Sequence, residues 1–150
     1  MNSLIQHLET ARDNDNLIIV AGNGGSLVNA LHFELHLQEK GFRAVSLTNP
    51  SILSARSNDF GVSNMFSSSI SALGREGDTF IAISGSGTSP NIIQAVRTAL
   101  ARNMFVVGIS YSKGSSLLKY STLPIVIDTL DMGEFEDMVS ALSHTLKNSL

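Results

Sequence analysis

The chain has 150 residues, enough for one domain (residues 1–150) with its own core, and its lack of cysteine excludes disulfides and thiolate ligands and suits a cytoplasmic protein. Its net charge of −3 argues against a nucleic-acid partner, and no apolar run reaches the roughly 18 residues that would indicate a membrane partner. Charged residues make up only 15%, below the about 25% of typical proteins, so we expect a homo-oligomer that covers part of the surface.

The predicted elements alternate between strands and helices. The first residues, MNSLIQHLETARDNDN, are polar and amphipathic, so we expect neither a signal peptide nor a membrane anchor in them. Short apolar runs bounded by turn residues predict strands buried on both faces at Leu17–Ala21, Ala44–Leu47, Thr79–Ser84, Phe105–Ser110 and Pro124–Asp128. Helical periodicity appears at 26–39, 64–74, 89–102 and 133–148, and the Ser- and Asn-rich patch Asn49–Asn64 has room for only a short helix. This order predicts an α/β fold, a three-layer αβα sandwich with a five-stranded parallel sheet.

Two glycine-rich turns follow the first and third strands, each at the start of a predicted helix. The first glycine turn reads Gly22-Asn23-Gly24-Gly25-Ser26, and the second reads Ser84-Gly85-Ser86-Gly87-Thr88-Ser89. Glycine lets the backbone approach a ligand, and a helix start offers free N–H groups and a positive dipole end. Either turn alone also fits an ordinary connection, but two together favour a ligand beyond the carboxyl ends of the strands. Because no G-x-G-x-x-G pattern or P-loop lysine accompanies them, we predict a single phosphate on a small molecule.

Two of the four histidines, His32 and His36, lie one helical turn apart after the first glycine turn and share a face. Histidines at this spacing are more often packing or surface residues than ligands, but their place behind an anion-binding turn favours a functional role. On its own, His144 reads as a partly buried polar residue of the last helix. His7 and Glu34 are interpreted as surface residues.

The motifs GNGGS, a histidine six residues after that serine, SNDFG, GREGD and SGSGTSPN occur in an order that resembles the sugar isomerase (SIS) domain of phosphoheptose isomerases. The resemblance spans Ile18 to about Leu146. It implies a flavodoxin-like parallel sandwich and a homotetramer with active sites at subunit interfaces. The implied activity converts sedoheptulose 7-phosphate into D-glycero-D-manno-heptose 7-phosphate, a precursor of lipopolysaccharide or capsule heptose. The alternative is a non-catalytic SIS protein that binds a sugar phosphate or a protein partner, as the DnaA initiator-associating protein does.

The resemblance also implies roles for individual residues. The implied substrate-binding residues are Asn23, Gly24, Gly25, Ser26, Asn58, Asp59, Ser84, Gly85, Ser86 and Ser89. The implied catalytic residues are His36, His144 and Glu136, and the implied zinc ligands are His32, His36, Glu136 and His144. His36 occupies the position where the family carries a glutamate base, and Glu136 supplies a carboxylate on the last helix instead. If His36 stays off the metal, its ordinary pKa near 6.5 also suits a base.

Overall fold

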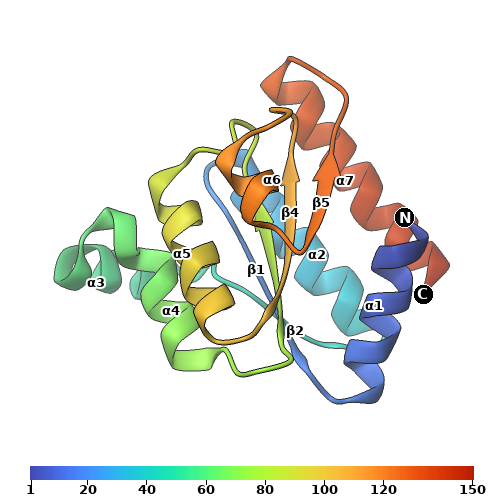
Figure 1. The fold of residues 1–150 in the computed structure, drawn as a ribbon, viewed down its shortest axis with the longest axis horizontal. Coiled ribbons are helices and arrows are strands. Elements are labelled where there is room, and N and C mark those ends of the chain that lie inside the picture. Colours follow the sequence, from blue (N-terminus) through green and yellow to red (C-terminus); the bar gives the residue numbers. More distant parts are fainter.

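The computed structural model describes residues 1–150 and is built around one five-stranded sheet (Figure 1). All neighbouring strands are parallel, in the spatial order β2-β1-β3-β4-β5. Their bounds are β1 Leu17–Gly22, β2 Arg43–Ser46, β3 Thr79–Ile83, β4 Phe105–Ser110 and β5 Leu123–Val126. Each of these strands arises from one of the predicted apolar runs, and the predicted α/β sandwich is confirmed. The predicted burial on both faces is wrong for β5, where Pro124 and Val126 are exposed because β5 is an edge strand.

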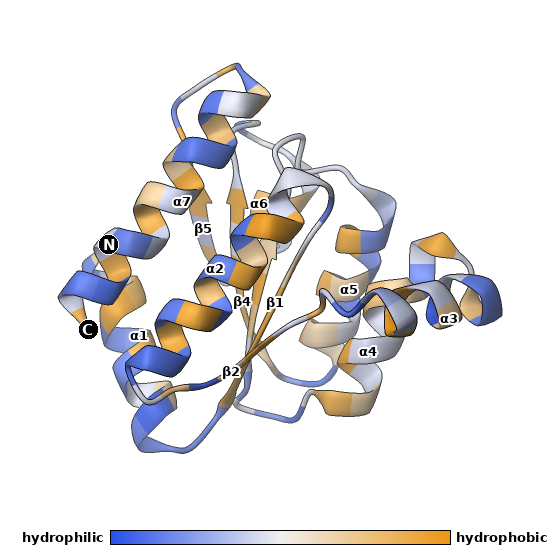
Figure 2. Cartoon of the chain, turned by 180° about the vertical axis from the view of Figure 1, so that it is seen from behind, coloured by the Kyte–Doolittle hydropathy of each residue, from blue (hydrophilic) through white to orange (hydrophobic).

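Helices cover both faces of the sheet. Their bounds are α1 Asn2–Asp13, α2 Gly25–Glu39, α3 Pro50–Phe60, α4 Met65–Leu73, α5 Pro90–Ala101, α6 Ser116–Tyr120 and α7 Met132–Ser149, with a 3-10 turn η1 at Val62–Asn64. The helices α1, α2 and α7 lie on one face, and α4, α5 and α6 lie on the other (Figure 1). The central strands β1, β3 and β4 are mostly apolar, whereas helices such as α5 and α7 carry both apolar and polar residues (Figure 2). No helix is long and apolar enough to cross a membrane.

Alternate residues of the central strands enter two separate cores. In β1, Ile18 and Val20 pack toward α1, α2 and α7, whereas Ile19 and Ala21 pack toward α4, α5 and α6. All four side chains are fully buried. Because both faces of these strands are covered, their sequences are continuously apolar rather than alternating.

The patch 49–64 contains a longer helix than the sequence predicts. The helix α3 has 11 residues, none of them buried, and it projects from the body of the molecule beside α4 (Figure 1). Asn49 caps its start, where its Oδ1 accepts hydrogen bonds from the backbone N–H groups of Ser51 and Ile52. Pro50 occupies the first helical position. Local capping therefore stabilises a helix that has no apolar face to reveal it in the sequence.

Two side chains that the sequence analysis interprets as surface residues are tied into the fold. His7 on α1 stacks on Phe105, with ring centroids 3.6 Å apart, and its Nε2 lies 2.8 Å from Thr79 Oγ1. Burial there lowers the pKa of His7 below its ordinary value. Glu34 on α2 accepts hydrogen bonds from the backbone N–H of Ser46, at 2.9 Å, and from its hydroxyl. The surface interpretation is wrong for both, because each side chain anchors its helix to a strand.

The strand order reverses between β1 and β3. From β1 the chain continues to β2 at one edge of the sheet, whereas from β3 it continues through β4 to β5 at the other edge. In open parallel sheets, ligands bind at this point, beyond the carboxyl ends of the strands. Both glycine turns leave the sheet here.

Candidate active site

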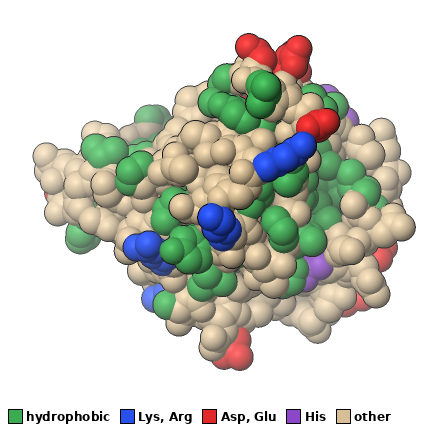
Figure 3. All heavy atoms as spheres, turned by 45° about the horizontal axis from the view of Figure 1, so that its top comes forward, with side chains coloured by type: hydrophobic (Ala, Val, Ile, Leu, Met, Phe, Trp, Pro, Cys, Tyr) green, Lys and Arg blue, Asp and Glu red, His purple; other side chains and the backbone are tan.

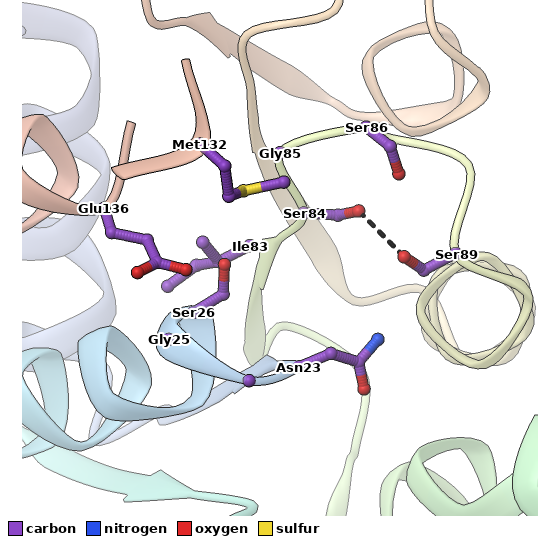
Figure 4. A pocket seen from close by; sticks show the side chains of 11 residues that line it. Asn23, Gly25, Ser26, Ile83, Ser84, Gly85, Ser86, Ser89, Met132 and Glu136 are labelled. Atoms are coloured by element: carbon purple, nitrogen blue, oxygen red, sulfur yellow. Dashed lines mark hydrogen bonds between the residues drawn. The ribbon is translucent and has the colours of Figure 1, made fainter. Parts of the chain in front are cut away.

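A pocket of about 280 Å³ opens where the strand order reverses. It is formed by the first glycine turn, the second glycine turn and the start of α7 (Figure 4). Its lining residues are Asn23, Gly24, Gly25, Ser26, Ile83, Ser84, Gly85, Ser86, Ser89, Met132 and Glu136. The structure thus brings together all the predicted substrate-binding residues of the two glycine turns. Glu136 is the only titratable side chain in the lining. It is therefore the one side chain of this pocket that could transfer a proton to or from a substrate.

The second glycine turn gathers hydroxyl groups at the start of α5. Ser84 Oγ lies 3.2 Å from Ser89 Oγ and accepts a hydrogen bond from the backbone N–H of Gly87 at 3.1 Å (Figure 4). Ser89 immediately precedes α5, yet its side chain makes no capping bond to the helix. Gly87 has a φ of +64°, and a Cβ at this position would collide with the side chain of Ser115. Hydroxyl donors and the positive end of a helix suit a phosphate.

The first glycine turn is covered by a carboxylate from the same chain. Gly24 has a φ of 56°, a backbone conformation that favours glycine. Glu136 approaches Gly25 so closely that a Cβ at this position would collide with the carboxylate. Because Gly25 is the first residue of α2, the carboxylate lies at the positive end of that helix, where a negative charge is stabilised. An external phosphate is therefore expected at the second glycine turn.

Charge is scarce around this pocket. Figure 3 brings the carboxyl ends of the strands toward the viewer and shows scattered Lys, Arg, Asp and Glu side chains among uncharged ones. No Lys or Arg lines the pocket. Within this chain a bound anion would therefore contact neutral hydroxyl and N–H donors.

Asn23 and Asn91 join the two glycine turns through a reciprocal pair of amide hydrogen bonds. The Nδ2 of each side chain donates to the Oδ1 of the other at 2.9 Å. Asn91 is buried near the start of α5, and its Oδ1 also accepts from the backbone N–H of Ile92 at 3.0 Å. The pair fixes the spacing of the turns. Asn91 was not among the predicted site residues, although an asparagine directly after Ser-Pro in SGSGTSPN is a visible signal.

Met132 is a further pocket residue that the sequence analysis missed. Its thioether approaches Gly85 so closely that a Cβ there would collide with it, and Tyr111 crowds the same position. Met132 precedes Glu136 by four residues, so both side chains project from one face of α7 toward the pocket (Figure 4). A lone methionine in an amphipathic helix carries no signal for such a role.

His32, His36 and His144 form a cluster between α2 and α7, outside the pocket lining. The ring centroids are 4.8 Å apart for His36 and His144, 5.4 Å for His32 and His36, and 5.7 Å for His32 and His144. His36 is buried, and its Nδ1 lies 2.7 Å from Ser143 Oγ. Burial lowers the pKa of His36, and the nearby His144 and Lys147 lower it further. The predicted meeting of these histidines is seen, but Ser143 is a partner that the sequence analysis missed.

The donor types of this cluster suit zinc, but the donor atoms do not form a zinc site as they stand. Imidazole and carboxylate groups are common zinc ligands, and His32 Nδ1 is buried without a hydrogen-bond partner. However, Glu136 lies over Gly25, and the chain has no group of three or more His, Cys, Asp or Glu side chains placed to hold a metal ion. Zinc binding therefore stays a prediction.

Asn58 and Asp59 lie on the projecting helix α3 and do not line the pocket. Both are exposed, and Asn58 Nδ2 donates a hydrogen bond to Asp59 Oδ1 at 3.0 Å. The structure does not bring them to the other predicted substrate-binding residues, because α3 points away from the sheet (Figure 1). Their contact with substrate stays a prediction that requires α3 of a second copy.

Comparisons with known proteins agree with this fold. Residues 1–110 match the family model described as SIS domain. The phosphoheptose isomerase of Campylobacter jejuni is 36% identical over 136 residues, which cover 86% of this chain and 73% of the relative. The phosphoheptose isomerase of Cytophaga hutchinsonii is 35% identical, over 86% and 71% of the two chains.

Solved structures give the same result. The phosphoheptose isomerase of Neisseria gonorrhoeae superposes with a TM-score of 0.93 at 30% identity, over 97% of this chain and 82% of that chain. The phosphoheptose isomerase of Francisella tularensis superposes with a TM-score of 0.91 at 25% identity, over 98% and 82%. The chain therefore belongs to the SIS domain family and stands among its phosphoheptose isomerases.

Proposed function

We propose that this chain is a sugar-phosphate isomerase that converts sedoheptulose 7-phosphate into D-glycero-D-manno-heptose 7-phosphate. The relatives named phosphoheptose isomerase support this activity. The observation that carries the proposal is the composition of the pocket. It has a hydroxyl-rich turn at a helix start for a phosphate and one carboxylate, Glu136, for the proton transfer.

In this proposal Glu136 moves one proton between neighbouring carbons. Its carboxylate removes a proton from C1 of the ketose, the electron pair of that C–H bond forms the C1–C2 double bond, and solvent water gives a proton to the carbonyl oxygen O2. The proton on Glu136 exchanges with solvent, and Glu136 then protonates C2 while the O1 hydroxyl gives its proton to solvent and becomes the carbonyl of the aldose. Atoms balance because substrate and product are isomers. A positioned carboxylate typically accelerates such a transfer by about 10²–10⁴-fold.

The two glycine turns place the substrate for this step. The phosphate binds Ser84, Ser86 and Ser89 at the start of α5, which leaves the reacting carbons near Glu136. Ser26 lies beside Glu136 in the pocket and can donate a hydrogen bond to a sugar oxygen (Figure 4). Holding the distant phosphate fixes C1 and C2 beside the base, and fixed geometry of this kind lowers the barrier.

The direct test is to incubate the protein with sedoheptulose 7-phosphate and to follow the appearance of the aldose by NMR. We expect turnover, together with a rise in melting temperature on addition of the sugar phosphate, because a ligand that binds only the folded state raises its stability. Stabilisation without turnover would favour the non-catalytic SIS alternative. The absence of both turnover and stabilisation would refute the proposal.

We also propose that the chain forms a homo-oligomer, either a dimer or a tetramer. On α2, Val28, Leu31 and Leu35 are 63%, 50% and 50% exposed and follow one another at helical spacing, so they form an apolar stripe. Glu136 already lines the pocket of its own chain, so this carboxylate need not come from a second copy. Sedimentation at micromolar concentration should give a multiple of 16.0 kDa, and a monomer would refute this part.

Zinc binding by His32, His36, Glu136 and His144 is retained as a separate proposal. The donor types and the unpartnered His32 Nδ1 support it, but Glu136 would have to leave Gly25 and turn toward the rings. Elemental analysis of protein purified without chelator or nickel resin tests it, and absence of stoichiometric zinc would refute it. We further propose a cytoplasmic location, because charged sugar phosphates remain in the compartment where they are made. We also propose that the product supplies heptose for lipopolysaccharide.

A further inference from the structure

Ser110, the last residue of β4, has a hydroxyl group that contacts the second glycine turn from behind. Its side chain is fully buried and does not line the pocket. Its Oγ donates a hydrogen bond to the backbone carbonyl oxygen of Gly85 at 2.8 Å and accepts one from the backbone N–H of Ser112 at 3.1 Å. A serine hydroxyl has one hydrogen to donate, and here that hydrogen is used by the turn.

This bond fixes the orientation of the peptide group between Gly85 and Ser86. A trans peptide group is planar, so its C=O and N–H bonds point in opposite directions, and the chain has no cis peptide bond. Because the carbonyl oxygen of Gly85 points at the buried Ser110, the N–H of Ser86 points the other way, to the side of the pocket that both turn residues line. That N–H makes no backbone hydrogen bond within the chain, so it is free to bind a ligand.

We propose that Ser110 is a positioning residue that holds this peptide group with the N–H of Ser86 toward a bound phosphate. Without the hydroxyl, the carbonyl group of the buried Gly85 would lose its partner, and a buried carbonyl group without a partner is costly. Glycine permits the peptide group to rotate in search of a new partner. Such a rotation would turn the N–H away from the phosphate and weaken binding, because oriented backbone N–H groups at a helix start are anion donors.

The other contacts of the turn with its neighbours do not depend on a side chain. The backbone N–H of Ser84 donates to the carbonyl oxygen of Ile109 at 3.0 Å, and the backbone N–H of Leu117 donates to that of Gly87 at 2.9 Å. Any residue could make these two bonds, whereas the bond to Gly85 needs the hydroxyl of Ser110. The effect of Ser110 on turnover rests on the proposed function, but its effect on phosphate binding does not.

The first test is binding of inorganic phosphate to the full chain, titrated by ³¹P NMR. We expect Ser110→Ala to raise the Kd about tenfold and Ser110→Thr, which keeps the hydroxyl, to recover most of the loss. Ser67→Ala is the matched control, because Ser67 is also buried and its Oγ donates to a backbone carbonyl oxygen, that of Asn64, at 3.0 Å on α4, away from the pocket. An equal Kd in Ser110→Ala and Ser67→Ala would overturn the proposal.

A second measurement needs no variant and therefore does not depend on Ser110→Ala folding. In ¹H–¹⁵N NMR of the unmodified chain, we expect the amide proton signal of Ser86 to move downfield as inorganic phosphate is added, because a hydrogen bond to an anion deshields the proton. A Ser86 amide signal that does not respond to phosphate would overturn the proposal.

Kinetics with sedoheptulose 7-phosphate separate positioning from a structural role. We expect Ser110→Ala to raise KM about tenfold and to change kcat by less than about twofold, because Glu136 lies on α7 and is not touched. A merely structural role would lower the melting temperature and leave KM as in Ser67→Ala, which would overturn the proposal. An unmodified chain without turnover, in which Ser110→Ala still weakens phosphate binding, would refute the proposed function and support the role of Ser110, so the two failures are distinguishable.

Discussion

The two glycine turns are similar in sequence but differ in what they contact. Both follow a buried strand, carry serine and start a helix at the point where the strand order reverses. The first is covered by the carboxylate of Glu136, which comes from α7, more than 100 residues later in the chain. The second remains open and presents the hydroxyl groups of Ser84, Ser86 and Ser89. One helix start thus holds an internal anion, and the other is available to an external one.

This difference gives each end of a sugar phosphate its own place. The positive end of α2 stabilises the carboxylate proposed as base, and the positive end of α5 attracts the phosphate. The reciprocal hydrogen bonds of Asn23 and Asn91 hold the two turns together. A helix start is therefore a ligand site only where the chain itself does not fill it.

The largest effect is expected when the carboxylate of Glu136 is displaced from the first glycine turn. A Cβ in Gly25→Ala would collide with Glu136 and push it away from the start of α2. We expect kcat to fall by about 100-fold or more with little change in KM, because the base moves while the phosphate turn stays intact. Steady-state kinetics measure both. Gly133→Ala, a change in α7 whose Cβ meets only Asp131 Oδ1 at 3.2 Å, is the matched control, and equal kinetics in the two variants would contradict the assignment.

The second glycine turn is tested by removing hydroxyl groups. The double variant Ser86→Ala, Ser89→Ala should raise KM by about 10- to 100-fold, because hydrogen bonds to a charged group are lost. It should also reduce the melting-temperature increase caused by the sugar phosphate. Ser54→Ala on exposed α3 serves as control. A double variant that responds to sugar phosphate as the unmodified chain does would place the phosphate elsewhere.

The link between the turns is tested with Asn91→Ala. This change removes both bonds to Asn23 and the acceptor for the N–H of Ile92. We expect the free energy of unfolding to fall by about 1–2 kcal/mol, as measured by urea denaturation. Asn148→Ala, an exposed asparagine of α7, should change it by less than about 0.5 kcal/mol. Equal losses in the two variants would show that the pair does not hold the turns.

The smallest expected effect lies at the opposite end of the sheet. Burial lowers the pKa of His7 in the folded chain, so the unfolded chain binds the proton more tightly. The stability that His7 contributes is fully present above pH 6.5, its ordinary pKa, and is lost as the pH falls through the lowered pKa. In His7→Gln the free energy of unfolding should decrease less steeply below pH 6.5, as measured by urea denaturation at several pH values. An identical pH dependence would contradict the burial effect.

The parts of the fold that could be predicted are those that depend on residues adjacent in the sequence. A strand buried on both faces needs a continuous apolar run, so runs such as Leu17–Ala21 reveal it directly. Both glycine turns are visible for the same reason, since their residues are contiguous. The full length of α3 could not be predicted, because its start depends on the cap of Asn49 and none of its residues is buried.

Contacts between distant segments could not be predicted. His7 and Glu34 look like surface residues until Phe105 and Ser46 are brought beside them by the sheet. The resemblance to phosphoheptose isomerases indicated Glu136 as a catalytic residue and a zinc ligand, but only the packing of α7 on α2 shows its carboxylate over a glycine of the pocket.

The central claim is that the carboxylate of Glu136 transfers the proton while the second glycine turn holds the phosphate. It is tested most directly by following sedoheptulose 7-phosphate in deuterium oxide by NMR, with the unmodified chain, Glu136→Gln and the exposed control Asp137→Asn. We predict solvent deuterium at C2 of the aldose for the unmodified chain and for Asp137→Asn. For Glu136→Gln we predict a rate lower by about 10²–10⁴-fold with the melting-temperature response to sugar phosphate retained. A Glu136→Gln variant that isomerises the sugar as fast as Asp137→Asn would contradict the account.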